Sequence, residues 1–158
     1  MNFKQSALAL VLGTMAATSA FAANSLTFQG VTFNTWAVDS DTLGLSILNA
    51  DSATGNWTGI QFLKAFEIKN IVTGGEIASA TISGPGAFTA SVTNGLAAFG
   101  CTTGGTAGAC FTSSPALALS NSMTWTMDFT ATAGGTLNFA APHLKVEFLT
   151  QATDRNAT

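Results

Sequence analysis

The sequence has few charged side chains, a single histidine and no tyrosine. Only 8% of its residues are Asp, Glu, Lys or Arg, whereas an average soluble protein has about 25%. The five basic residues are scattered, so the sequence lacks the basic cluster that marks nucleic-acid-binding proteins. Threonine, serine, asparagine, glycine and alanine take the places of charges, which resembles the surfaces of secreted β proteins. We therefore expect no nucleic-acid partner.

The scarcity of histidine and the spread of the carboxylates limit the possible catalytic sites. No serine lies in the Gly-x-Ser-x-Gly pattern of a nucleophile elbow. The only histidine, His143, precedes an expected strand, and a triad would need a nucleophile and an orienting group beside it. A glycosidase pair of carboxylates would have to be assembled by the fold. We predict that the protein is not an enzyme, with His143 as a strand-edge residue.

One apolar segment lies at the N-terminus. Lys4 precedes an apolar and small-residue run over Ala7–Ala17, and Ala20-Phe21-Ala22 has the small-x-small pattern of a cleavage site. These features predict a secretory signal peptide over residues 1–22. The run is shorter than the ~20 residues that span a bilayer, and no second such run follows. We expect an exported protein with no transmembrane segment after cleavage.

Residues 23–158 have the pattern of a single all-β domain. Apolar and polar residues alternate strictly over Met123–Thr130 and His143–Leu149, and clusters of turn residues recur along the chain. This pattern predicts an antiparallel β-sandwich, jelly-roll-like, with about eight to ten short strands. The alternation changes phase at Gln29-Gly30, which predicts a bulge within one strand over Leu26–Val38. Roughly the last eight residues are expected to be disordered.

The two cysteines, Cys101 and Cys110, enclose a glycine-rich stretch of eight residues. In an exported protein, two cysteines this close in sequence are predicted to form a disulfide, which would order a surface tip without large apolar side chains. The alternatives are a metal site and a redox-active pair. Two thiolates fall short of the four ligands of structural zinc, and the spacing is not Cys-x-x-Cys.

Two further patterns suggest ligand contacts. Trp57 follows a polar turn, so it is a candidate for stacking on a sugar ring, with packing in the fold as the alternative. Asp39, Asp41 and Asp51 are candidate oxygen ligands for calcium, although no EF-hand pattern is present and Asp39 and Asp41 also suit a turn. Apart from this calcium candidate, no cofactor is expected.

The runs "LTFQGVTF", "NSMTWTMDFT" and above all "GGTLNFAAPHLKVEF" resemble exported proteins of Gram-negative bacteria that carry a PEP-CTERM sorting signal. The resemblance covers Leu26–Leu149. The chain ends at "QATDRNAT", without the Pro-Glu-Pro motif, hydrophobic span and basic end of that family, so we expect a truncated member or a freely secreted one. The resemblance implies a β domain associated with the cell envelope and the exopolysaccharide matrix, with no set of catalytic residues.

Two functions of different classes follow as expectations. The first is a non-catalytic cell-surface or biofilm-matrix protein with a structural or adhesive role, associated with exopolysaccharide or with itself. Strand donation by "LTFQGVTF" is one form of this role. The second is a carbohydrate-binding module that uses Trp57 and loop residues, with or without calcium. In both cases we expect the protein outside the cell or on the outer surface of a Gram-negative bacterium.

Overall fold

The computed structural model describes residues 23–98, 100–103 and 108–152. The expected signal peptide, residues 104–107 of the predicted tip, and residues 153–158 of the expected disordered tail lie outside the described residues. The described chain consists of β-strands with two short 3-10 helices. Within it, the helices are too short to cross a membrane.

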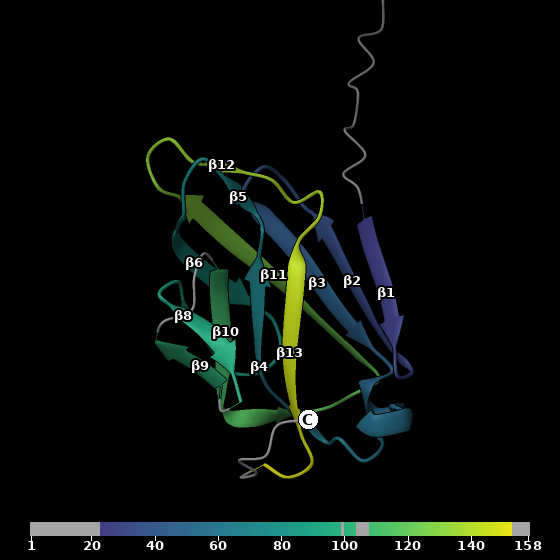
Figure 1. The fold of residues 1–158 in the computed structure, drawn as a ribbon. Coiled ribbons are helices and arrows are strands. Elements are labelled where there is room, and N and C mark those ends of the chain that lie inside the picture. The colour runs from purple at the N-terminus through teal and green to yellow at the C-terminus, as the bar shows by residue number, and fades with distance from the viewer. Residues whose placement is uncertain (1–22, 99, 104–107, 153–158) are drawn as a thin grey trace, which may run out of the picture.

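Two antiparallel sheets pack face to face (Figure 1). The five-stranded sheet has the order β1 (Ala23–Phe28), β2 (Val31–Ala37), β3 (Thr42–Leu48), β11 (Ser122–Ala131) and β6 (Ile77–Ser83). The four-stranded sheet has the order β13 (His143–Leu149), β4 (Phe62–Lys69), β10 (Gly108–Ala118) and β7 (Phe88–Ser91). The predicted all-β, antiparallel sandwich is confirmed.

Four short strands and two 3-10 helices lie outside these sheets. The strands form the pairs β5 (Val72–Thr73) with β12 (Thr136–Leu137) and β8 (Asn94–Ala97) with β9 (Gly100–Thr103). The helices η1 (Ala50–Ser52) and η2 (Gly55–Trp57) connect β3 to β4. The β8–β9 hairpin contacts β4, β10 and β13, so it forms a partial third layer outside the four-stranded sheet.

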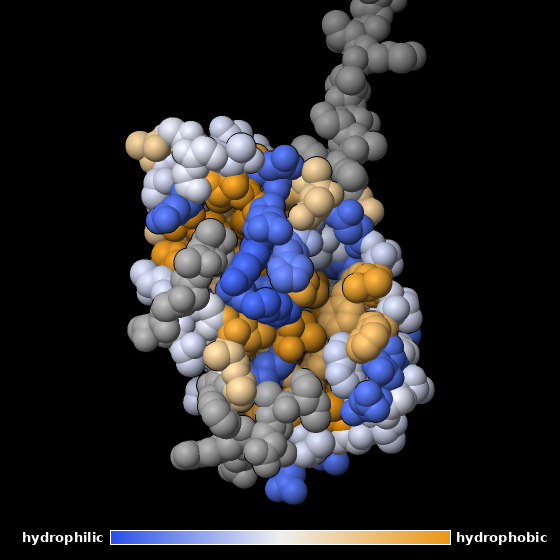
Figure 2. Space-filling view, in the orientation of Figure 1, coloured by the Kyte–Doolittle hydropathy of each residue, from blue (hydrophilic) through white to orange (hydrophobic). Residues whose placement is uncertain are grey.

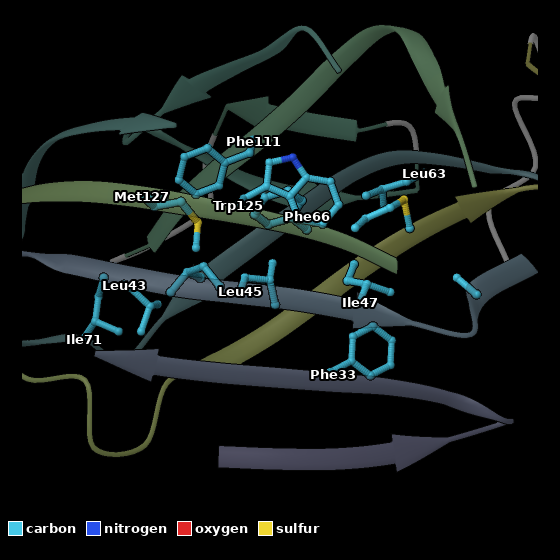
Figure 3. Close-up of a cluster of buried hydrophobic side chains, with 14 of the residues drawn as sticks. Phe33, Leu43, Leu45, Ile47, Leu63, Phe66, Ile71, Phe111, Trp125 and Met127 are labelled. Carbon is cyan, nitrogen blue, oxygen red and sulfur yellow. The ribbon is translucent and has the colours of Figure 1, made fainter. Parts of the chain in front are cut away.

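The core lies between the two sheets, where alternate residues of each strand point inward. Figure 3 shows aliphatic side chains of β3 directed toward the rings of Phe66 and Phe111 in the opposite sheet, with Trp125 of the neighbouring strand β11 beside them. The Phe66 ring centroid lies 5.0 Å from that of Phe111 and 5.6 Å from that of Trp125. The Trp125 indole N–H donates a hydrogen bond of 2.9 Å to the Pro85 carbonyl, which satisfies its one polar group. The strict alternation around Trp125 is thus explained by burial of one face of β11.

The predicted bulge at Gln29-Gly30 is wrong, because these residues form a two-residue turn between β1 and β2. Gln29 and Gly30 both have positive φ angles, 52° and 81°, as a type I′ hairpin turn requires. The Phe28–Val31 pair closes the turn, and pairing continues without irregularity to the other end of β1. The change of phase therefore marks a reversal of the chain, and β1 becomes the edge strand of its sheet.

Candidate functional site

The five-stranded sheet extends one strand beyond the four-stranded sheet on the side where β1 and β13 lie. On β2, Val31 and Phe33 point inward and are buried, and the Phe33 ring lies 6.4 Å from that of Phe148 on β13. The register places Phe28 and Leu26 of β1 beside them, on the same inward face. Yet Leu26 is 65% exposed and Phe28 is 51% exposed. The inward face of β1 is therefore largely uncovered.

A groove of about 700 Å³ lies where β1 extends beyond β13, and we call this offset the step between the sheets. Its lining is mainly apolar, with Leu26 and Phe28 on one side and Leu144 and Val146 of β13 on the other. Figure 2 shows hydrophobic surface where Figure 1 places β1, beside a hydrophilic band over β4 and β13. The Asn24 amide donates a hydrogen bond of 3.1 Å to the Ala140 carbonyl and so connects β1 to the segment before β13. The groove thus has an apolar interior with polar groups at its rim.

Trp57 forms part of the groove wall. It ends η2 and is half-buried, with its ring centroid 5.1 Å from that of Phe28, 6.1 Å from that of Phe33 and 5.3 Å from that of Phe148. All three contacts are edge-to-face. The Gln29 side chain accepts a hydrogen bond from the Asn56 backbone N–H and ties η2 to the β1–β2 turn. The ring is therefore held in place by packing, and its exposed part lines the groove.

Five charged residues on β4 and β13 form a cluster that the sequence pattern did not reveal. The three lysines of the described residues, Lys64, Lys69 and Lys145, lie with Glu67 and Glu147 on β4 and β13. The Glu67 carboxylate oxygens lie 3.1 Å from the Lys69 ammonium nitrogen and 3.6 Å from that of Lys145. The register sets Lys145 opposite Glu67, with Glu147 two residues further along the same strand. These side chains therefore gather on the outer face of the four-stranded sheet.

The β8–β9 hairpin covers the two carboxylates of this cluster. Glu67 is completely buried and Glu147 is 3% exposed. Burial raises the pKa of Glu147, while the nearby Lys64 ammonium and a hydrogen bond from the Gly100 backbone act in the opposite direction. Two neighbouring carboxylates also occur in glycosidases, but there the substrate lies between them. Here both carboxylates are buried where the hairpin contacts β4 and β13, so the arrangement suits packing of the hairpin better than chemistry on a substrate.

The predicted disulfide is present between Cys101 on β9 and Cys110 on β10, with a sulfur–sulfur distance of 2.10 Å. Cys110 pairs with Glu67 of β4 in the sheet register, so its side chain lies on the same outer face. The bond therefore attaches the β8–β9 hairpin over the buried carboxylates. The sequence suggested only that the disulfide orders a surface tip, whereas in the structure it also attaches a hairpin to the four-stranded sheet.

The three candidate calcium ligands are not brought together. Asp39 and Asp41 lie in the turn between β2 and β3, where an Asp39 carboxylate oxygen accepts hydrogen bonds from the backbone N–H groups of Asp41 (3.1 Å) and Thr42 (2.7 Å). Hydrogen bonds from Thr42 and Asp41 lower the pKa of Asp39. Asp51 lies in η1, beyond the opposite end of β3 and about 20 Å away along a strand of this length. In the described part of the chain, no three His, Cys, Asp or Glu residues are grouped to hold a metal ion.

His143 begins β13 and is exposed at the rim of the groove. The strand that the sequence predicts at this point is present as β13. Leu26 and Phe28 belong to the run that the sequence suggested as a donor strand, but the sequence-based prediction placed them in one bulged strand rather than in the separate edge strand β1. The sequence signal at this point is Gly30, which suits a hairpin turn as well as a bulge, and the positive φ angles of Gln29 and Gly30 in the structure distinguish the two.

Comparisons with protein-family models, curated proteins and solved structures give no significant match to this chain. The resemblance to PEP-CTERM-type proteins stays a prediction.

Proposed function

We propose that the protein is a non-catalytic, exported component of the cell envelope or extracellular matrix, with a structural or adhesive role exerted through the groove. The observation that carries this proposal is the uncovered inward face of β1, where Leu26 and Phe28 stand beside an apolar groove. Contiguous apolar surface of this kind is typical of sites that bind other molecules. An unpaired edge strand beside it is typical of sites that bind an extended polypeptide.

The charge distribution supports a polypeptide partner over a highly charged one. The described chain has no charged residue before Asp39, so β1, its turn and β2 are all neutral. The lysines and glutamates at the groove are paired or covered on the outer face of β4 and β13. A neutral apolar groove gains affinity from burial of apolar side chains rather than from ion pairing.

The second candidate function is a carbohydrate-binding module. The observation in its favour is that Trp57 lies in the groove wall beside Phe28, where an aromatic face can stack on a sugar ring. Sugar recognition also needs polar groups placed to bind the hydroxyls. The mainly apolar lining supplies few of these, so the structural role ranks first. Calcium assistance is not part of this candidate, since Asp39 and Asp41 lie at the other end of β3 from Asp51.

The test is co-sedimentation of the protein, as an expressing Gram-negative host exports it, with exopolysaccharide and envelope fragments of the producing organism. We expect the protein in the pellet with and without a calcium chelator. A Trp57→Phe variant keeps an aromatic ring in the wall and removes the indole. Unchanged sedimentation of this variant supports the structural role, whereas loss of binding to purified polysaccharide supports the carbohydrate-binding module. Protein that stays in the supernatant under every condition contradicts both.

A further inference from the structure

We propose that the occupant of the groove is a second copy of this chain, whose β1 strand completes the four-stranded sheet beside β13. The inference rests on the proposed structural role, because it names the partner of the same groove. The two sheets differ in width at the step between them. β13 lies opposite β2, and β1 has no strand opposite it among the described residues. One further strand beside β13 would cover Leu26 and Phe28 and make the two sheets equal in width.

Two-fold symmetry allows each copy to supply this strand to the other. Consider an axis that runs between the two layers, parallel to the strands, on the side where β1 overhangs. Rotation about this axis places the partner's five-stranded sheet level with the four-stranded sheet of the first copy. The partner's β1 then fills the space beside β13, and β1 of the first copy fills the equivalent space in the partner. A surface that complements itself in this way is what a closed dimer requires.

The backbone of β1 is prepared for such pairing. In a two-residue hairpin, the pair that closes the turn, here Phe28 and Val31, exchanges both of its backbone hydrogen bonds, and the pattern alternates along the ladder. Ser25 and Thr27 therefore direct their N–H and C=O groups to the free edge. Natural edge strands are usually protected by charges, proline or bulges. β1 has none of these.

The side chains of the interface are compatible with self-association because β1 is uncharged. Leu26 and Phe28 of one copy would face the partner's Leu26 and the partner's Phe28 across the axis, so no like charges meet. Each of these side chains exposes on the order of 100 Å². The four together provide about 400 Å², whereas a stable interface buries roughly 1,200–2,000 Å² in total. The remaining buried area would come from the paired edges of β1 and β13 and from the rest of the groove lining. Two such strand pairs, one on each side of the axis, can supply an area of this size.

The experiment is sedimentation equilibrium of the exported protein over a wide range of concentrations, with three variants. Leu26→Lys places a charge on the inward face of β1, at a position that the monomer leaves mostly exposed. Ser25→Pro removes an N–H from the free edge and leaves the apolar row intact. Val38→Lys is the matched control, because Val38 is 45% exposed but lies outside β1 and the groove lining. Circular dichroism and thermal unfolding establish that each variant is folded.

We expect a reversible dimer for the wild type and for Val38→Lys. In Leu26→Lys the dissociation constant should rise by at least about 100-fold, since the substitution occurs twice in the interface and each buried leucine contributes more than a tenfold effect. Ser25→Pro should also weaken the dimer. If Leu26→Lys fails to fold, the dissociation constant of Ser25→Pro alone tests whether β1 forms the dimer interface.

A monomeric wild type would overturn the proposal, as would a dimer that Ser25→Pro leaves intact or that Val38→Lys disrupts. A monomer that still co-sediments with envelope or exopolysaccharide would remove the dimer and leave the proposed function standing. A dimer that binds neither envelope fragments nor exopolysaccharide would support the dimer and contradict the proposed function.

Discussion

Removal of the Cys101–Cys110 disulfide should lower the free energy of unfolding by about 2.7 kcal/mol. The bond closes a loop of ten residues, since its cysteines are nine positions apart. The loss of chain entropy on closing such a loop in the unfolded state gives this value in the standard model. The perturbation is the double variant Cys101→Ala/Cys110→Ala, which leaves no thiols to react. The wild type treated with a reducing agent provides a second form without the bond.

Urea unfolding followed by tryptophan fluorescence measures this loss, because Trp125 is 1% exposed and becomes hydrated on unfolding. The midpoint should fall while the slope stays close to that of the wild type. A second measurement tests the position of the hairpin. If the bond holds the β8–β9 hairpin over Glu147, its removal lets water reach the carboxyl, and the raised pKa of Glu147 should move back towards the ordinary value. The pKa can be followed by NMR titration of the side-chain carboxyl.

Two outcomes would contradict these expectations. A loss of less than about 1 kcal/mol would mean that the unfolded chain gains little freedom, contrary to the loop-closure argument. A pKa of Glu147 that stays raised would mean that the hairpin remains in place without the bond, so that packing alone holds it.

Three further predictions concern the interior and the sheets. Glu147→Gln should increase stability at neutral pH, because a carboxyl whose pKa is raised in the folded state destabilises that state when ionised. Unfolding measured against pH should show this gain vanish below about pH 4.3, the ordinary glutamate pKa, and a constant gain at all pH values would disagree. Gly44→Ala should cost about 1–3 kcal/mol in urea unfolding, since an added Cβ overlaps the Trp36 indole that covers Gly44; an unchanged midpoint would show that the indole moves freely aside. Phe66→Ala should cost about 3–5 kcal/mol by the same assay, because it leaves a cavity among the central rings, and a smaller loss would indicate collapse of the site.

The sandwich could be predicted from the sequence because strand alternation states directly which residues face the core. The alternation around Trp125 and around Val146 identifies strands whose inward faces pack against the other sheet. The disulfide was predictable for a similar reason, since Cys101 and Cys110 are close in the chain and need little of the fold to meet. Both inferences depend on local information.

The groove and the charge cluster depend on contacts between distant parts of the chain. Glu67 and Glu147 become neighbours only because β4 pairs with β13 in one particular register, and alternation alone does not choose the register of two distant strands. Leu26 looks like an ordinary inward residue of a strand. Its exposure follows from the order of strands in the opposite sheet, which ends at β13.

The hairpin and the groove meet at β13, and this gives the disulfide a place in the proposed binding surface. On the outer face, Lys145 contacts buried Glu67 beneath the attached hairpin. On the free edge, the same strand borders the groove, and residues 96–98 at the end of β8 line it as well. A strand that is fixed on one face and open at its edge is already ordered before a partner arrives, so pairing requires less loss of conformational entropy. The cluster of buried charges and the disulfide would therefore favour the proposed pairing at the edge of β13 by holding that strand and its rim in place.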